Sequence, residues 1–131
     1  MIIDNIPLRV QRTKNHWQWL NLNSFRNNHY QVNNKMKHRF SSDLMAAIGD
    51  RVKECPEPPV ELIYTIYRRD RRKIDLGNIG AILDKFTSDA LVYCKMLPDD
   101  NTDYIRAITY IDGGVDKQNP RATLEIRHWE Q

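Results

Sequence analysis

Three aspartates, Asp75, Asp99 and Asp100, have the residue type and spacing that a divalent-cation site would need. Asp75 follows a basic run and comes just before an apolar helical pattern, and Asp99 and Asp100 come just after that pattern. We expect the helix to return the chain so that the 99–103 loop approaches the sheet edge at which Asp75 lies. Carboxylates brought together in this way suit Mg²⁺, which prefers oxygen ligands. Such sites hydrolyse phosphodiesters by activating water.

The same aspartates also suit structural roles. Aspartate is favoured at helix N-caps, so Asp75 would cap the helix that follows it. The loop from Asp99 to Asp103 would then be a solvated turn, in which aspartate and asparagine are common. Residue type and spacing leave both interpretations open.

A second group of side chains could hold a polyanion. The run at 68–73 has five positive charges and one negative charge. Residues 1–40 have seven Lys or Arg residues against a single acid, giving +6, whereas the remaining 91 residues give −3. This uneven distribution indicates a polyanionic partner such as nucleic acid. The alternative is that these cations form a solvated helix face and a solvated strand end.

The segment 15–34 combines aromatic residues with seven asparagines. Asparagine favours turns and competes with regular structure, so we expect a strand near Trp17–Leu22 followed by an ordered polar loop. We interpret Trp17, Trp19 and Tyr30 as core or dimer-interface residues in preference to base-stacking groups.

Hydrophobic periodicity predicts the elements that would position these groups. Apolar residues recur every three or four positions over 34–52 and again over 79–93, which predicts two main helices. β-Branched and aromatic residues alternate over Val60–Arg68, the clearest strand, and weaker alternation predicts strands at 7–12, 104–112 and 122–128. The expected fold class is α+β with a mixed sheet in the order β-α-β-α-β-β, its last two strands forming a hairpin.

Composition limits the broad class of protein. The 131 residues suit a single domain over 1–131, and 40% of them are hydrophobic, which is enough for a compact core. No apolar segment is long enough to cross a bilayer, and the N-terminus has no apolar signal-peptide region, so we expect a non-exported protein with no membrane partner. Cys55 and Cys94 have no zinc-site spacing with the histidines, and we expect both thiols to be reduced.

Three segments resemble the RusA-type Holliday junction resolvases. They are Arg71-Arg-Lys-Ile-Asp-Leu-Gly-Asn78, the helix with Lys85 and Asp89-Ala-Leu91, and Leu97-Pro-Asp-Asp100. Upstream, Leu20-Asn-Leu-Asn-Ser-Phe-Arg26 is similar to the family's N-terminal loop. The resemblance covers roughly residues 18–127, and its specific motifs lie between residues 68 and 100. It implies a small, dimeric, Mg²⁺-dependent endonuclease of phages or prophages, acting in the cytoplasm of a bacterial host.

The resemblance also implies roles for particular residues. Asp75 matches the first metal-binding aspartate of the family's Asp-x-Asp-Asn motif, but Gly77 stands where the second is expected. Asp100 matches the family's later catalytic aspartate, with Asp99 beside it as a further metal ligand. Lys85 matches the family's helix lysine if this helix has about one extra turn before Asp89-Ala-Leu91, whereas an alignment anchored on Asn78 places Ala81 there. The lysine would stabilise developing charge or orient water.

Two residues could supply the carboxylate that Gly77 lacks. Asp84 follows seven residues later on nearly the same helix face, about 10 Å along the axis. It would complete a shifted site with Asp75 and Asp100, and the alternative is an exposed Asp84–Lys85 pair. Asp99 is the other candidate. The residues expected to contact DNA are Asn23, Arg26, His29, Arg69, Arg71, Arg72 and Lys73.

The first functional hypothesis is a structure-selective endonuclease that resolves Holliday junctions or other branched DNA as a homodimer. It would use Mg²⁺, or Mn²⁺ as a substitute. The second hypothesis is a non-catalytic protein of the same fold that binds branched or single-stranded DNA, which Gly77 would favour. A third is a general basic RNA-binding protein.

Overall fold

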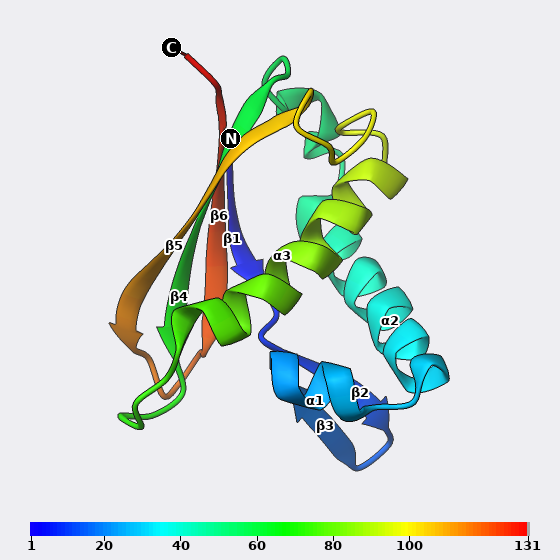
Figure 1. Cartoon of the computed structure of the whole chain (residues 1–131), viewed down its shortest axis with the longest axis vertical. Helices are drawn as coiled ribbons and strands as arrows, with labels where there is room; N and C mark the ends of the chain where they lie inside the picture. The colour runs from blue at the N-terminus through cyan, green and yellow to red at the C-terminus, as the bar shows by residue number, and fades with distance from the viewer. Residues whose placement is uncertain (131) are drawn as a thin grey trace.

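The computed structural model of the protein describes residues 1–130, and in it two long helices cover one face of a four-stranded sheet (Figure 1). In chain order the elements are β1 (Ile2–Ile6), β2 (Arg9–Thr13), β3 (His16–Trp19), α1 (Leu22–Asn27), α2 (Tyr30–Ile48), the short 3₁₀ helix η1 (Arg51–Glu54), β4 (Val60–Arg68), α3 (Leu76–Tyr93), β5 (Ile105–Val115) and β6 (Arg121–His128). The expected α+β class with a mixed sheet is confirmed.

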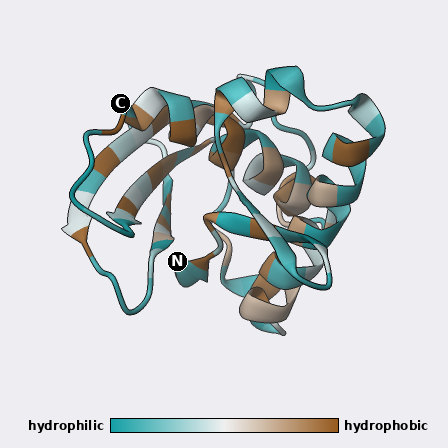
Figure 2. Ribbon diagram, turned by 90° about the horizontal axis from the view of Figure 1, so that it is seen from below, coloured by the Kyte–Doolittle hydropathy of each residue, from teal (hydrophilic) through white to brown (hydrophobic). Residues whose placement is uncertain are grey.

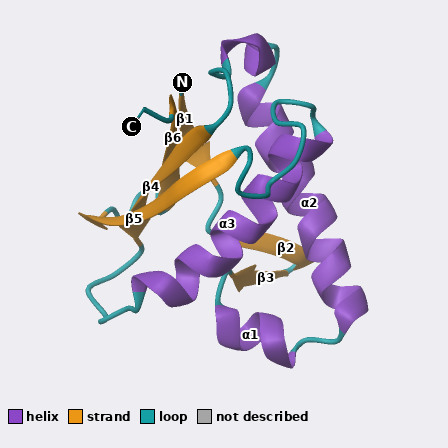
Figure 3. Ribbon diagram, turned by 45° about the horizontal axis from the view of Figure 1, so that its top comes forward, coloured by secondary structure: helices purple, strands orange, loops and turns teal. Residues whose placement is uncertain are grey.

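The strand β4 is the centre of the sheet, whose order is β1-β6-β4-β5 (Figure 3). It pairs antiparallel with β6 and parallel with β5, which the chain reaches through α3. Alternate side chains of β4 point toward the helices and are completely buried: Val60, Leu62, Tyr64 and Ile66. This strand is where the sequence predicts it, because a half-covered sheet produces strict alternation.

Two expectations about the strands are wrong. β5 and β6 do not form a hairpin, because β4 lies between them. The helical crossover returns β5 parallel to β4 on one side, and β6 then pairs with the other side of β4. The expected order β-α-β-α-β-β also has too few elements at its start. Three strands and a short helix precede α2 in the structure. The first strand, β1, pairs with β6, and β2 and β3 form a separate hairpin.

The asparagine-rich segment forms helix ends in place of the expected ordered polar loop. The side chain of Asn21 caps α1 by accepting from the backbone amides of Asn23 at 2.8 Å and Ser24 at 3.3 Å. Nδ1 of His29 caps α2 by accepting from the amide of Gln31. Asparagine competes with helix interiors because its side chain hydrogen-bonds nearby backbone, and the same property makes it a good N-cap.

The helices α2 and α3 bury the apolar stripes that their periodicity predicts. In α2 the buried residues Met36, Phe40, Leu44 and Ile48 recur every four positions. The helix is capped by Gly49, whose φ of +60° is a conformation that favours glycine. It therefore ends before residue 52, the predicted end. Phe40 and Phe86 pack edge to face between the two helices, with ring centroids 5.6 Å apart. Figure 2 shows that the connecting loops are mostly hydrophilic.

The two cysteines and the membrane expectation can also be compared with the structure. Cys55 and Cys94 are both free and half-buried. Burial raises the pKa of the Cys55 thiol, and the nearby Cys94 raises it further. Among residues 1–130, no helix combines the length and the apolar character needed to cross a bilayer.

Gly80 allows α3 to lie directly against β5. A Cβ placed on Gly80 would come within 2.7 Å of ring carbons of Tyr110, closer than real Cβ atoms approach other groups. The Tyr110 ring also lies 5.8 Å from that of Tyr64 on β4. The contact therefore fixes the distance between the helix and the two strands that the helix connects.

We expect Gly80→Ala to lower the free energy of unfolding by about 1–3 kcal/mol, because overpacking at this contact outweighs the better helix propensity of alanine. Gly77→Ala is the matched control, since its added Cβ would meet only Asp75 Oδ1 at 3.4 Å. Urea unfolding of the two variants and the wild type measures the difference. Equal stabilities of the two variants would contradict the close approach.

Candidate functional site

Asp84, in the middle of α3, is held by two hydroxyl groups. Tyr64 Oη donates to Asp84 Oδ1 at 2.7 Å, and Ser88 Oγ, one helical turn later, donates to the same oxygen at 2.9 Å. Oδ2 of Asp84 makes no hydrogen bond to the described residues. It is not completely buried, because within residues 1–130 Thr87 Oγ1 alone is a completely buried side-chain polar atom without a partner. One oxygen is therefore fixed, and the other keeps its lone pairs unused by the described residues.

The environment of Asp84 opposes its negative charge. Burial raises the pKa of Asp84, and the nearby charges of Asp100 and Asp89 raise it further, whereas the hydrogen bonds from Tyr64 and Ser88 lower it. Burial and the charge of Asp84 raise the pKa of Tyr110 to about 12. A proton or a cation at Asp84 would relieve both the desolvation of its carboxylate and the repulsion from its neighbours.

Asp99 and Asp100 differ in how far their own loop occupies them. Asp99 Oδ1 accepts from the amide of Asp100 at 2.7 Å, and Asp99 Oδ2 accepts from Asn101 Nδ2 at 3.1 Å. Both oxygens of Asp99 therefore stabilise the turn. Asp100 is exposed, and its carboxylate makes no hydrogen bond or ion pair with the residues that the structure describes. The structure makes Asp100 the member of this pair that is free to bind.

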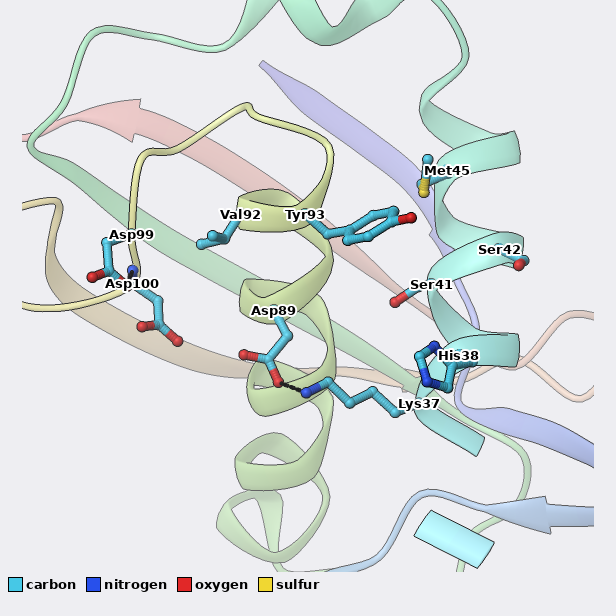
Figure 4. Close-up of a pocket in the computed structure, with 10 residues that line it drawn as sticks. All are labelled: Lys37, His38, Ser41, Ser42, Met45, Asp89, Val92, Tyr93, Asp99 and Asp100. Carbon is cyan, nitrogen blue, oxygen red and sulfur yellow. Dashed lines mark hydrogen bonds and ion pairs between the residues drawn. The ribbon is translucent and has the colours of Figure 1, made fainter. Parts of the chain in front are cut away.

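A groove of about 500 Å³ lies between α2 and the C-terminal part of α3, and Asp99 and Asp100 form part of its wall (Figure 4). Asp89 of α3 also lines it and forms an ion pair with Lys37 of α2, with Nζ and Oδ2 2.6 Å apart. Figure 4 shows the Asp100 side chain directed from its loop toward α3. Lys37 and Asp89 did not stand out in the sequence as site residues, because only the packing of α2 on α3 joins them.

Asp75 does not meet Asp100 within one copy of the chain. Asp75 caps the N-terminus of α3, its Oδ1 accepting from the amide of Gly77 at 3.0 Å. The loop with Asp99 and Asp100 follows the other end of this 18-residue helix, which is about 27 Å long. Figure 1 shows the two loops at opposite ends of α3. The expected approach of the 99–103 loop to Asp75 is therefore wrong for a single chain, and the structural role of Asp75 as a cap is confirmed.

Of the shifted site that the sequence predicts, Asp84 and Asp100 lie close enough for the charge of Asp100 to raise the pKa of Asp84. Asp75 is about 13 Å from Asp84 along the helix axis and is not part of this pair. Lys85 lies against α1, with its Nζ 5.7 Å from the ring centroid of Phe25. Across residues 1–130, no three His, Cys, Asp or Glu side chains are arranged as a ready-made metal-binding group.

The basic run forms an exposed loop at the N-terminal end of α3. Asp70 shapes it by accepting from the amide of Arg72 at 3.0 Å. Arg68 is committed to structure, because its guanidinium donates to both carboxylate oxygens of Asp112 and to the carbonyl of Arg72. Arg71, Arg72 and Lys73 are exposed, so they are available to contact phosphate groups.

The three candidate DNA contacts before α2 are all exposed. Asn23 and Arg26 lie on α1. His29 caps α2, and its ring lies 4.5 Å from that of Tyr30. Asn21, which starts α1, lines a small cavity together with residues of the basic loop, including Arg69, Arg72 and Lys73. The start of α1 and the basic loop are therefore neighbours.

The raised pKa of Asp84 leads to a pH-dependent stability. Above this pKa the ionised carboxylate lowers the stability of the folded state, and protonation removes this cost as the pH falls through the pKa. Asp84→Asn keeps an oxygen acceptor without the charge. We expect its melting temperature to exceed that of the wild type at about pH 7. The difference in melting temperature should become smaller toward about pH 4. Asp103→Asn, in an exposed loop position, is the control. An advantage that grows on acidification would contradict the assignment.

Comparison with protein-family models and with curated proteins finds no match to this chain. The candidate sites therefore stand on their geometry. That geometry has two parts: an acidic group, defined as Asp84, Asp89 and Asp100, and an exposed basic loop at the opposite end of α3.

Proposed function

We propose that this protein is a RusA-type, divalent-metal-dependent endonuclease that acts on branched DNA. The observation that carries the proposal is the state of Asp84, whose Oδ1 is held by Tyr64 and Ser88, whose Oδ2 makes no hydrogen bond to the described residues, and whose pKa is raised by burial and further by the charge of Asp100. The resemblance of the 71–100 segment to the resolvases supports the choice of substrate.

The acidic group fits Mg²⁺ of the kind that enzymes use on phosphates. Mg²⁺ keeps several water ligands and is commonly held by one or two carboxylates together with substrate phosphates. Asp84 Oδ2 and the carboxylate of Asp100 would provide these two ligands, so three clustered acids are not required. When bound, the cation would supply an activated water and stabilise the leaving oxygen. Tyr64 and Ser88 would orient Asp84.

The exposed cations would hold the DNA backbone. Arg71, Arg72 and Lys73 have no carboxylate partner other than Asp70 among the described residues, and Arg72 leaves 80% of its side chain exposed. Each phosphate contact would add affinity that falls with salt and would not select a sequence. A homodimer would place two such sites on a two-fold junction, as the resemblance implies.

A specific observation favours a second candidate function, that of a branched-DNA-binding protein without cleavage. Asp75 is engaged as a helix cap, and Gly77 supplies no second carboxylate beside it. If catalysis required the metal ligands that the family places at these two positions, this chain would bind junctions without cutting them. The two candidate functions differ in where the essential carboxylates lie.

We expect the protein to nick a synthetic four-way junction in Mg²⁺ or Mn²⁺ and not in EDTA. Asp84→Asn and Asp100→Asn should each lower the cleavage rate by about 100-fold or more, the usual loss when a group that stabilises developing charge is removed. Asp103→Asn removes the same charge from the same loop as Asp100→Asn and should cleave normally. A folded protein that binds junctions but cuts them with neither metal would establish the second candidate function.

Variants at the start of α3 separate the two possible metal positions. Asp75→Asn keeps the cap, since asparagine and aspartate are comparable N-caps, and we expect it to leave cleavage within about two-fold of the wild type. Gly77→Asp has room for its Cβ, whose nearest contact is at 3.4 Å, and restores the family's acid. It should change neither the rate nor the metal requirement if Asp84 and Asp100 hold the cation. Loss of cleavage in Asp75→Asn, or a clear gain in Gly77→Asp, would place the metal at Asp75 instead.

A further inference from the structure

A second surface of the molecule has the features of a nucleic-acid site and lies outside the acidic group. Its core is an alternation of indoles and guanidinium groups, here called the Trp–Arg stack and defined as Trp17, Arg9, Trp19 and Arg69. Arg9 Cζ lies 4.7 Å from the ring centroid of Trp17 and 5.4 Å from that of Trp19. Arg69 Cζ lies 4.4 Å from the ring centroid of Trp19.

The β2–β3 hairpin builds this stack from its register. Arg9 pairs with Trp19 and Gln11 pairs with Trp17, so both tryptophans share one face of the hairpin with Arg9. Arg69 joins from the loop after β4. Trp19 is half-buried against the core, whereas Trp17, at the end of the stack, leaves 44% of its surface exposed. Trp17 is therefore not a core residue, and its expected alternative role at a dimer interface stays a prediction.

The stack forms one wall of a groove of about 700 Å³, a volume within the usual range for ligand sites. The groove is also lined by Lys117 and Asn119, from the loop that leads into β6, and by Arg121, the first residue of β6. The basic loop continues from this groove, because Arg69 and Trp19 also line the small cavity that Arg72 and Lys73 border.

The groove has an excess of positive charge. Within residues 1–130, Arg9 and Lys117 form no ion pair. Asp43 is the acid in its lining, and Arg39 already lies 3.7 Å from it. Arg121 is paired with Asp116 at 2.9 Å, and its guanidinium also lies 4.2 Å from the ring centroid of Tyr67. A ligand that is anionic and planar would match both the cations and the exposed indole.

These features select an unpaired strand over a duplex or a peptide. Bases stack on aromatic side chains only when they are not already stacked within a helix, and such stacking with a cationic groove is typical of single-strand binding. A regular duplex would contact the cations through its phosphates and leave Trp17 unused. An acidic peptide would likewise use the cations but not the face of the indole.

We propose that this groove binds an unpaired DNA strand, with one base stacked on Trp17 and the adjoining phosphates at Lys117 and the basic loop. Branched DNA exposes such unpaired nucleotides where its arms meet. The proposal does not depend on cleavage, because the groove and the acidic group have no residue in common.

The test measures binding of a fluorescently labelled oligothymidine and of a duplex of equal length by anisotropy, with the full chain in EDTA so that cleavage plays no part. The wild type should prefer the unpaired strand. Trp17→Ala should weaken that binding by about 10-fold to 100-fold, and Trp17→Phe should restore most of it. Trp129→Ala is the matched control, since Trp129 follows the far end of β6, and it should bind normally. Circular dichroism confirms that each variant is folded.

Salt dependence separates stacking from charge. Lys117→Ala should reduce the slope of log affinity against log salt by about 0.7, the value for one phosphate contact on a single strand. Trp17→Ala should lower affinity and leave the slope unchanged. The proposal is overturned if Trp17→Ala binds oligothymidine like the wild type, or if it weakens duplex binding equally. Displacement of the oligonucleotide by polyglutamate as readily as by unlabelled oligothymidine would assign the groove to an acidic protein.

Discussion

The packing of Gly80 against the ring of Tyr110 is the contact on which the acidic group depends. The ring leaves no room for a Cβ at residue 80, so α3 lies directly on β5. Asp84 and Ser88 follow one and two turns later on the same face of the helix, within reach of Tyr64 on β4. A helix held farther from the sheet would leave Asp84 without its phenol donor. Its carboxylate would then also lose some of the burial that raises its pKa.

The separation of charge along α3 explains how one small domain can hold both an acidic group and a cationic surface. The basic loop precedes α3, and the loop with Asp100 follows it, with about 27 Å of helix between them. At physiological ionic strength, exposed charges are largely screened beyond about 8 Å. The cations of the basic loop are therefore not neutralised by the acidic group and can attract a polyanion. The exception is Lys37, which α2 brings against Asp89.

The sequence predicts those features of the structure whose pattern lies within a single helix or strand. The strand β4 and the apolar stripe of α3 are read correctly, because alternation and a 3.6-residue period reflect burial within one element. The sequence does not predict the short strand β1 or the position of β5 in the sheet. β1 is stabilised by pairing with β6 and β5 by pairing with β4, and these partners are far apart in the chain. The sequence does not predict the cap that Asn21 makes on α1, because asparagine is common both in loops and at helix N-caps.

The sequence alone determined the class of chemistry that is available: carboxylates on and after one helix, a basic run before it, and tryptophans within a basic N-terminal part. Which carboxylates lie near one another was decided only by tertiary structure, because α3 is rigid and holds Asp75 apart from the loop that follows its other end. The same packing brings Asp84 within the influence of the charge of Asp100 and stacks Arg9 and Arg69 on the tryptophans. These contacts join residues far apart in the chain, and no local pattern specifies the distance between them.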